Sequence, residues 1–184
     1  MKEFNLPYFI YTGNAYPHKN LEKVIRAIIE INKNSETKIM FLIVSSRNVF
    51  TTKLEKLINK LNAKDIVKLL GFVEDKQLNE LYRNSIGFIF PSLMEGFGLP
   101  GLEAMKAGTI LLASDIPVFR EIYGNHATYF NPNEIKSIES AMKKTMEISK
   151  MDGIRIIKDN KEFVKRYSWE KMARETLQVY NSLK

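Results

Sequence analysis

Short apolar runs alternate with amphipathic stretches through most of this chain, and this alternation limits the fold more than any other feature of the sequence. The apolar runs, rich in β-branched and aromatic residues, predict strands at residues 8–11, 39–44, 66–70, 86–90, 109–113 and 127–130. Between the first two runs, apolar residues recur at helical spacing, at Leu21, Val24, Ile25, Ile28 and Ile29. Strands that alternate with helices are typical of a parallel sheet with helices on its faces. We therefore expect an α/β fold with a doubly wound, mostly parallel, six-stranded sheet.

Two shorter helices are expected in the middle of the chain. Asp75 is a suitable N-cap for a helix that carries Leu78, Leu81 and Tyr82. The second helix follows a glycine-rich loop, covers about residues 98–107 and ends at Gly108.

After Pro132 the pattern is helical to the end of the chain. One helical face is apolar at Ile135, Ile138, Met142, Thr145 and Met146. Ser168 can cap a final helix, and we expect most of its apolar side chains to belong to the core: Trp169, Met172, Leu177 and Tyr180. With 184 residues, the chain is expected to form one domain over residues 1–184, with residues 168–184 as the final helix.

The composition excludes several kinds of functional site. The sequence contains no cysteine, which rules out disulfides, thiolate metal sites and cysteine nucleophiles. The two histidines, His18 and His126, are too few for a multi-histidine metal site. We therefore expect no metal and no cofactor, and we interpret His126 as a surface residue.

The net charge of +7 favours anionic partners, which include nucleotides, nucleic acid and an acidic membrane surface. The basic residues are scattered along the sequence, however, as in an ordinary solvated surface. No apolar run is long enough to span a membrane, and the N-terminus lacks the apolar stretch of a signal peptide. We expect a cytoplasmic protein, with the inner face of the membrane as the other candidate location.

Residues 13–20 link the first predicted strand to the first predicted helix. A loop at a helix N-terminus presents free backbone N–H groups and the positive end of the helix dipole, so it is a natural site for an anion. Gly13 opens this loop, and Lys19 adds a charge suited to phosphate. The alternative, an ordinary strand–helix turn with a solvated lysine, is equally compatible with this segment alone.

A second loop, residues 91–103, lies between a predicted buried strand and a helix. Its glycines, Gly96, Gly98 and Gly101, are expected to let a ligand approach the backbone closely. Glu95 and Glu103 are separated by seven residues, and we expect both to face one crevice, where carboxylates can accept hydrogen bonds from sugar or ribose hydroxyls. The alternative is a tight loop with two surface glutamates.

These segments resemble the group 1 retaining glycosyltransferases, which have the two-domain GT-B fold. The resemblance is most specific in Pro91-Ser92-x-x-Glu95-Gly96-Phe97-Gly98-Leu99-Pro100 with Glu103, the family's E-x7-E pattern. The Gly13 to Lys19-Asn20 segment is similar to the family's phosphate loop, and Gly71-Phe72-Val73 to its base-pocket segment. The resemblance covers nearly the whole chain and implies the Rossmann-like donor-binding half of the GT-B fold.

The resemblance also implies a role for each matched residue. Lys19 and the N–H groups of residues 98–101 would hold the diphosphate of a sugar nucleotide, and Glu103 would bind its ribose. Glu95, with nearby backbone N–H groups, would hold the sugar, whereas Phe72 and Val73 would line the base pocket. The expected catalytic residues are Lys19 and Glu95, and the full expected donor site comprises Gly13, Lys19, Phe72, Val73, Glu95, Gly96, Phe97, Gly98, Leu99 and Glu103.

The chain departs from the family pattern at two places. Relatives often carry an arginine after the first glycine and Gly-x-Gly after the second strand, where this chain has Asn14 and Ser45-Ser46-Arg47-Asn48. His18 or Arg47 is a candidate for the second phosphate cation. These changes concern the details of donor binding.

The resemblance implies that complete members of this family also have an N-terminal acceptor domain, which we expect to be missing here. We therefore expect a hexosyltransferase that binds donor but is inactive without that domain or a separate acceptor subunit. In relatives the final helix crosses toward the N-terminal domain, so an exposed apolar face there would favour self-association. The resemblance implies polysaccharide or glycolipid synthesis and is compatible with peripheral membrane association of the complete enzyme.

Three other functions are alternatives to a donor-binding domain of a glycosyltransferase. The first is a non-catalytic nucleotide-binding or assembly module on the same fold, although Lys19, Glu95 and Glu103 are all retained. The second is a nucleic-acid or membrane-surface binder, against which the lack of a basic cluster argues, so we expect no nucleic acid as partner. A sugar-nucleotide epimerase is the most distant, because the E-x7-E pattern does not indicate one.

Overall fold

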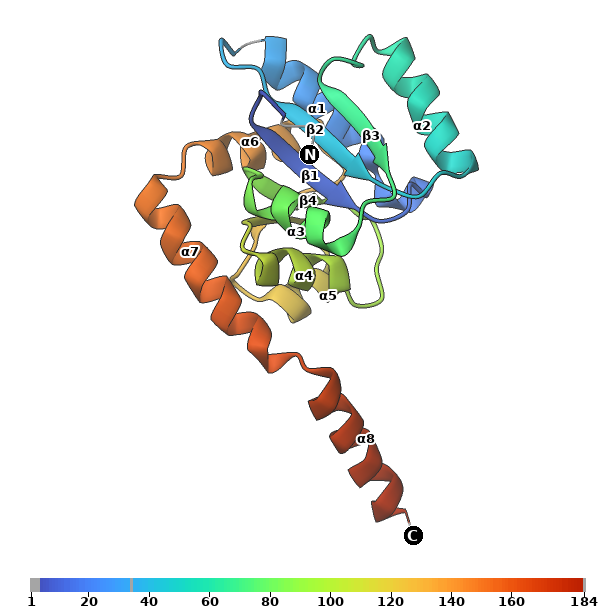
Figure 1. Ribbon diagram of the computed structural model, residues 1–184, viewed down its shortest axis with the longest axis vertical. Helices are drawn as coiled ribbons and strands as arrows, with labels where there is room; N and C mark the ends of the chain where they lie inside the picture. The colour runs from blue at the N-terminus through green and yellow to red at the C-terminus, as the bar shows by residue number, and fades with distance from the viewer. Residues whose placement is uncertain (1–3, 34, 184) are drawn as a thin grey trace.

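The computed structural model describes residues 4–33 and 35–183 and contains a six-stranded sheet in which every described pairing is parallel (Figure 1). The strand order is β3-β2-β1-β4-β5-β6. The strands are β1 (Tyr8–Thr12), β2 (Met40–Val44), β3 (Val67–Gly71), β4 (Gly87–Phe90), β5 (Leu111–Ser114) and β6 (Thr128–Phe130). The doubly wound α/β fold predicted from the sequence is confirmed.

The described residues form eight α-helices in addition to the sheet. The described α-helices are α1 (Leu21–Lys33), α2 (Val49–Lys60), α3 (Asp75–Arg83), α4 (Leu99–Ala107), α5 (Pro117–Tyr123), α6 (Ile135–Met146), α7 (Lys150–Phe163) and α8 (Trp169–Ser182). Short 3₁₀ turns lie at η1 (Pro17–Lys19) and η2 (Val164–Arg166). Helix α1 packs against α2 and α6, whereas α4 packs against α3 and α7. The helices between successive strands thus supply the crossovers that parallel pairing requires.

The core lies where the central strands meet these helices. All residues of β1, β2, β4 and β5 are buried, which explains why their sequences are continuous apolar runs instead of alternating ones. Helix α1 buries Leu21, Val24, Ile25 and Ile28, as its periodicity predicts. Phe9, Phe41, Phe88 and Phe90 are all buried within this core.

The strand order reverses between β1 and β4. On one side of this point the chain proceeds from β1 to β2 and β3, and on the other from β4 to β5 and β6. In doubly wound sheets the crevice at such a reversal, beyond the carboxyl ends of the strands, is where ligands bind. The loops after β1 and β4, residues 13–20 and 91–98, flank this crevice.

Three predictions about the elements need correction. Asp75 is the first residue of α3 and does not cap it, because Glu74 holds the N-cap position without a side-chain hydrogen bond. Strand β5 begins at Leu111, two residues later than predicted; the Thr109 N–H still donates to the Ala104 carbonyl of α4 at 3.2 Å. Helix α5 was not predicted at all; it is short and begins with Pro117.

The final helix lies apart from the core. Ser168 caps α8 as predicted, since its hydroxyl accepts a hydrogen bond from the Lys171 N–H at 3.2 Å. None of the residues of α8 is buried, and Figure 1 shows the helix extending away from the sheet. The prediction that Trp169, Met172, Leu177 and Tyr180 belong mostly to the core is therefore wrong.

Candidate functional site

The loops after β1 and β4 are tied to each other at the reversal of strand order. The Leu93 N–H donates to the His18 carbonyl at 2.8 Å. The Asn20 side-chain amide donates to the carbonyls of Pro91, at 3.2 Å, and Pro132, at 2.8 Å. These bonds fix the two loops in one arrangement, so the side chains that they carry are held at defined positions.

Lys19 and Glu95, one from each loop, form an ion pair in this crevice. The Lys19 ammonium donates to Glu95 Oε1, and the Ser92 hydroxyl donates to the same oxygen at 2.7 Å. The side chains of Lys19 and Glu95 are only 12% and 14% exposed. The ammonium also lies 5.7 Å from the centre of the Phe90 ring. The structure thus brings together the two predicted catalytic residues, which lie 76 positions apart in the sequence.

Helix α4 begins beside this pair. Gly98 is its N-cap, in the left-handed region with φ of 99°, and Leu99 and Pro100 form the first turn. Of the N–H groups of residues 98–101 that were predicted to hold a diphosphate, Pro100 has none and that of Gly101 donates to the Gly98 carbonyl at 3.1 Å. This end of α4 therefore offers the Leu99 N–H, and the helix dipole makes it positive. An anion in the crevice would therefore meet both the Lys19 ammonium and the positive end of α4 at Leu99.

The predicted reason for Gly98 and Gly101, that a ligand approaches the backbone closely there, is wrong. A Cβ at Gly98 or Gly101 would not face an open crevice but would overlap with the hydroxyl of Tyr123, a fully buried residue at the end of α5. Those glycines are needed by the protein's own packing. At Gly96, in contrast, no atom lies within 4 Å of an added Cβ, so this position is open.

Glu103 lies on the exposed side of α4 and influences the ends of the central strands electrostatically. Burial raises the pKa of Tyr82 well above its usual value, a hydrogen bond with Thr12 at 2.7 Å opposes this rise, and the charge of Glu103 adds to it. Burial likewise raises the pKa of Tyr11, and the charge of Glu95 contributes. Thr12 is the last residue of β1, so both carboxylates act on groups at the carboxyl edge of the sheet.

A cavity of about 300 Å³ opens at the carboxyl ends of β1, β2 and β3. Phe72 and Val73, the predicted base-pocket residues, line it together with Gly13. Phe72 is 80% exposed, so its ring is available for contact with a ligand. Ser45 and Ser46 also line the cavity. Gly13 and Asn14, which belong to the same loop as Lys19, also line the cavity, so the cavity adjoins that loop.

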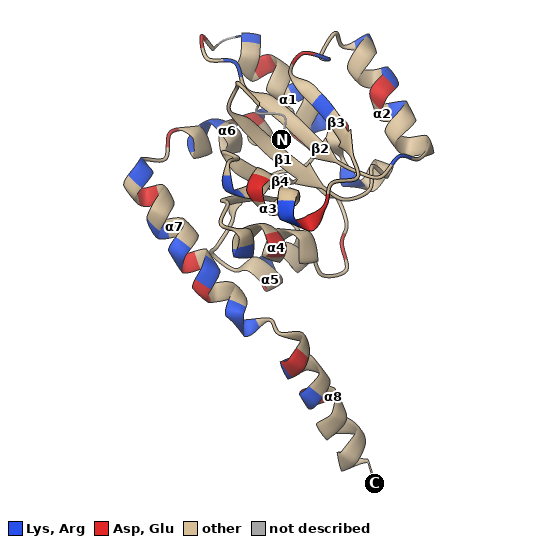
Figure 2. Cartoon of the chain, in the orientation of Figure 1, with Lys and Arg blue, Asp and Glu red and all other residues tan. Residues whose placement is uncertain are grey.

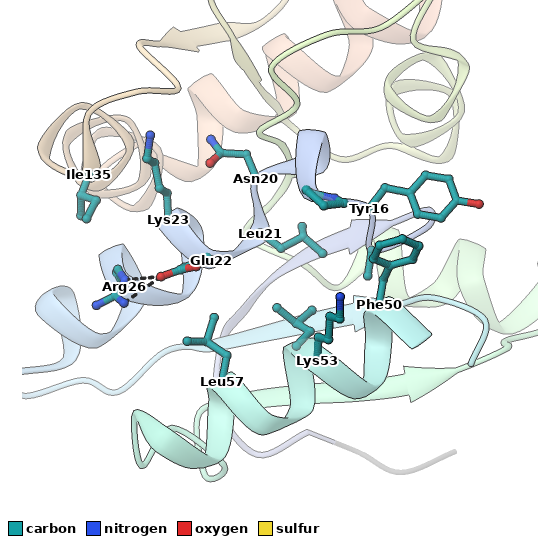
Figure 3. A pocket seen from close by; sticks show the side chains of 13 residues that line it. Tyr16, Asn20, Leu21, Glu22, Lys23, Arg26, Phe50, Lys53, Leu57 and Ile135 are labelled. Atoms are coloured by element: carbon teal, nitrogen blue, oxygen red, sulfur yellow. Dashed lines mark hydrogen bonds and ion pairs between the residues drawn. The ribbon is translucent and has the colours of Figure 1, made fainter. Parts of the chain in front are cut away.

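A wider hollow of about 560 Å³ lies between α1 and α2, and Tyr16 and Asn20 of the loop after β1 also line it (Figure 3). Its wall includes Leu21 and Leu57, with Arg26 held by an ion pair to Glu22. Tyr16 and Phe50 close one end, with ring centres 4.9 Å apart. None of the predicted site residues lines this hollow.

The charges of the described chain do not gather into one basic stripe. Figure 2 shows Lys and Arg interspersed with Asp and Glu along α2 and α7. His126, predicted as a surface residue, is half-buried: its ring stacks on Phe163 at 3.9 Å, and its Nδ1 lies 3.1 Å from the Asn160 side-chain oxygen. Within residues 4–33 and 35–183, no helix combines the length and apolar character needed to cross a membrane.

Two side chains that shape the site were not singled out from the sequence. Ser92 holds Glu95, and the serine three residues before a loop carboxylate was a usable signal. Tyr123 supports Gly98 from another helix, and no local pattern indicates such a contact.

Comparison with known proteins agrees with this architecture. A family model described as "Glycosyl transferases group 1" matches residues 2–162. The O-antigen chain mannosyltransferase RfbU of Salmonella typhimurium is 34% identical over 165 residues, which cover 90% of this chain and 44% of that protein. The O-antigen chain mannosyltransferase B of Escherichia coli is 26% identical over 176 residues, with coverage of 96% and 46%. The chain thus spans less than half the length of these relatives.

Solved structures share the fold at low sequence identity. Sucrose-phosphate synthase from Thermosynechococcus elongatus superposes with a TM-score of 0.85 at 22% identity, over 97% of this chain and 46% of that one. A glycosyltransferase from Rickettsia africae gives a TM-score of 0.84 at 20% identity, over 98% and 48%. In both comparisons the similarity concerns about half of the larger protein.

Proposed function

This chain belongs to the group 1 glycosyltransferases, and we propose that within the family it is the domain that binds the nucleotide-sugar donor. The observation that supports this most directly is the meeting of Lys19 and Glu95 at the reversal of strand order, beside the N-terminus of α4. In this proposal a cation, a carboxylate and the backbone N–H at the start of α4 face one crevice. A nucleoside diphosphate sugar needs each of these: a cation and N–H groups for its phosphates, and an acceptor for its hydroxyls.

The diphosphate is the part of the donor on which the chemistry depends. When the bond between the sugar and the diphosphate breaks, negative charge grows on the departing phosphate oxygen. A fixed cation and aimed N–H groups stabilise that charge more strongly in the transition state than in the ground state. In our proposal Lys19 and the Leu99 N–H at the start of α4 provide this stabilisation, without a metal or cofactor.

The sugar is proposed to lie against Glu95 and the open backbone at Gly96. One carboxylate oxygen of Glu95 already accepts two hydrogen bonds, from Lys19 and Ser92. The second oxygen can accept from a sugar hydroxyl. Since the two relatives named above are mannosyltransferases, we propose mannose, a hexose, as the transferred sugar, with retention of its anomeric configuration.

The nucleoside is proposed to occupy the cavity at the ends of β1, β2 and β3. Phe72 and Val73 would contact the base and Glu103 the ribose hydroxyls. The polar wall of Ser45 and Ser46 offers hydroxyls to the base or ribose.

Transfer is proposed to need an acceptor-binding half in addition to the domain that these residues form. The chain spans 44% and 46% of the two mannosyltransferases named above. The exposed apolar residues of α8, among them Trp169 and Tyr180, would pack against that half or a separate acceptor subunit, and in its absence would favour self-association. We place the complete enzyme in the cytoplasm, at the inner face of a membrane, in polysaccharide or glycolipid synthesis.

Calorimetric titration with UDP, GDP and ADP, followed by their sugar conjugates, tests this proposal. Saturable binding of one nucleoside diphosphate, with further selectivity for one sugar, is the expected result. Adding a polynucleotide at low and high salt provides a control for attraction by net charge alone. Failure of every nucleotide to bind, in a chain that melts cooperatively, would favour the alternative of a non-catalytic assembly module.

A further inference from the structure

Tyr123, at the end of α5, contacts the loop before α4 from inside the protein. Its side chain is fully buried, and its hydroxyl donates to the carbonyl of Gly98 at 2.5 Å. The same hydroxyl occupies the space where a Cβ at Gly98 or Gly101 would lie. The loop and the tyrosine therefore fit each other closely, and neither glycine could be replaced without displacing the ring.

The direction of the Gly98 carbonyl determines the direction of the next N–H. A peptide unit is planar and trans, so the C=O of Gly98 and the N–H of Leu99 point in opposite directions. The carbonyl is fixed inward by two donors, the Tyr123 hydroxyl and the Gly101 N–H at 3.1 Å. The Leu99 N–H, the first of α4, is thereby directed away from Tyr123.

The tyrosine is itself rigidly held. Its ring packs on Phe119, with centroids 5.1 Å apart, and Phe119 packs on Phe90 of β4 at 4.7 Å. The Tyr129 hydroxyl lies 2.9 Å from the Phe119 carbonyl oxygen and 2.8 Å from that of Gly124, so its single proton is shared between carbonyls on both sides of Tyr123. Burial raises the pKa of the Tyr123 hydroxyl well above its usual value, so the group stays protonated and remains a donor.

We propose that Tyr123 is a positioning residue for donor binding: its hydroxyl fixes the Gly98–Leu99 peptide so that the Leu99 N–H is presented to the diphosphate. This inference rests on the proposed function, because the diphosphate is the ligand that the N–H would meet. Tyr123 does not touch the ligand itself. Its contribution should therefore concern the phosphates and leave the nucleoside contacts, at Glu103 and Phe72, unchanged.

The test compares Tyr123→Phe with Tyr8→Phe. Both variants keep the ring and remove one buried hydroxyl that donates to a backbone carbonyl. Tyr8 lies on β1, away from the crevice, and its hydroxyl donates to the Leu81 carbonyl at 2.9 Å. Binding of the nucleoside diphosphate and of the nucleoside alone is measured by calorimetry. We expect Tyr123→Phe to weaken diphosphate binding roughly fivefold, the scale of one neutral hydrogen bond, with nucleoside binding unchanged. Tyr8→Phe should change neither.

Equal diphosphate affinity in Tyr123→Phe and wild type would overturn the inference, and so would an equal loss for nucleoside and diphosphate. Amide hydrogen exchange over residues 96–101 provides a readout that needs no ligand. We expect faster exchange there in Tyr123→Phe than in Tyr8→Phe, and unchanged exchange would refute the positioning role. If wild type bound no diphosphate, the proposed function would fail, while the exchange comparison would still decide whether Tyr123 orders the loop.

Discussion

The Lys19–Glu95 pair implies that Glu95→Gln will strengthen the binding of a free nucleoside diphosphate. In the ligand-free protein the Lys19 ammonium is already bonded to Glu95. A diphosphate must take the place of that carboxylate, so part of its binding free energy is spent on separating the pair. Glutamine has the same shape and can still accept the hydrogen bond from Ser92, but it carries no charge to compete for Lys19.

The size of the effect follows from the burial of the pair. Fully exposed ion pairs contribute about 0.2–1 kcal/mol, but these two side chains are only 12% and 14% exposed, so solvent screens them less. A charge-assisted hydrogen bond contributes about 1.5–3 kcal/mol. Taking the lower figure, since a diphosphate and Glu95 can share the ammonium in part, we expect a gain of about 1.5 kcal/mol, or roughly tenfold in Kd.

Titration of wild type and Glu95→Gln with a nucleoside diphosphate, and then with its sugar conjugate, measures this effect. The gain should be seen with the diphosphate and be reduced or reversed with the sugar nucleotide, because the variant loses a contact to the sugar. Glu139→Gln, which breaks the surface pair with Lys143 on α6, removes the same charge elsewhere and should leave both affinities unchanged. Weaker or unchanged diphosphate binding in Glu95→Gln would refute the competition between carboxylate and diphosphate.

Four further variants test other parts of the account. Glu103→Ala should weaken nucleoside binding several-fold even when phosphate and sugar are absent; an unchanged nucleoside Kd in calorimetry would argue against a ribose contact. Gly98→Ala should lower the free energy of unfolding by about 2–4 kcal/mol, because the new Cβ overlaps with Tyr123 and the backbone is left-handed. Gly96→Ala should be nearly neutral, and similar urea midpoints for these two variants would contradict this. Trp169→Ala, at a 71% exposed site, should change stability by less than about 0.5 kcal/mol, and a large drop in Tm would show that the helix packs on the domain.

Most of the fold could be predicted because burial leaves a direct mark on the sequence. The central strands are buried on both faces, so each is an unbroken apolar run, and α1 shows a clean helical period. Helix α5 escaped prediction because its seven residues are too few to establish a period. The apolar face of α8 was assigned to the core because periodicity shows that a face is apolar but not which surface covers it.

The candidate site was predictable in its residues but not in its contacts. The loop motifs mark Lys19 and Glu95, yet their pairing depends on β1 and β4 being neighbours, and sequence alone does not give strand order. The glycines of the second loop were interpreted as access for a ligand. Gly98 and Gly101 instead accommodate the Tyr123 side chain. Tyr123 lies 25 positions after Gly98 in the sequence, so no local pattern indicates this contact.

The central claim, that this crevice binds the diphosphate of a nucleotide sugar, is tested most directly by Lys19→Ala. The measurement is calorimetric titration of wild type and variant with the nucleoside diphosphate that wild type prefers, and with the corresponding nucleoside. The account predicts that the variant loses about 1.5–3 kcal/mol of diphosphate binding and retains its nucleoside affinity. Diphosphate binding equal to that of wild type would contradict the assignment of Lys19, and with it the placement of the donor at the ends of β1 and β4.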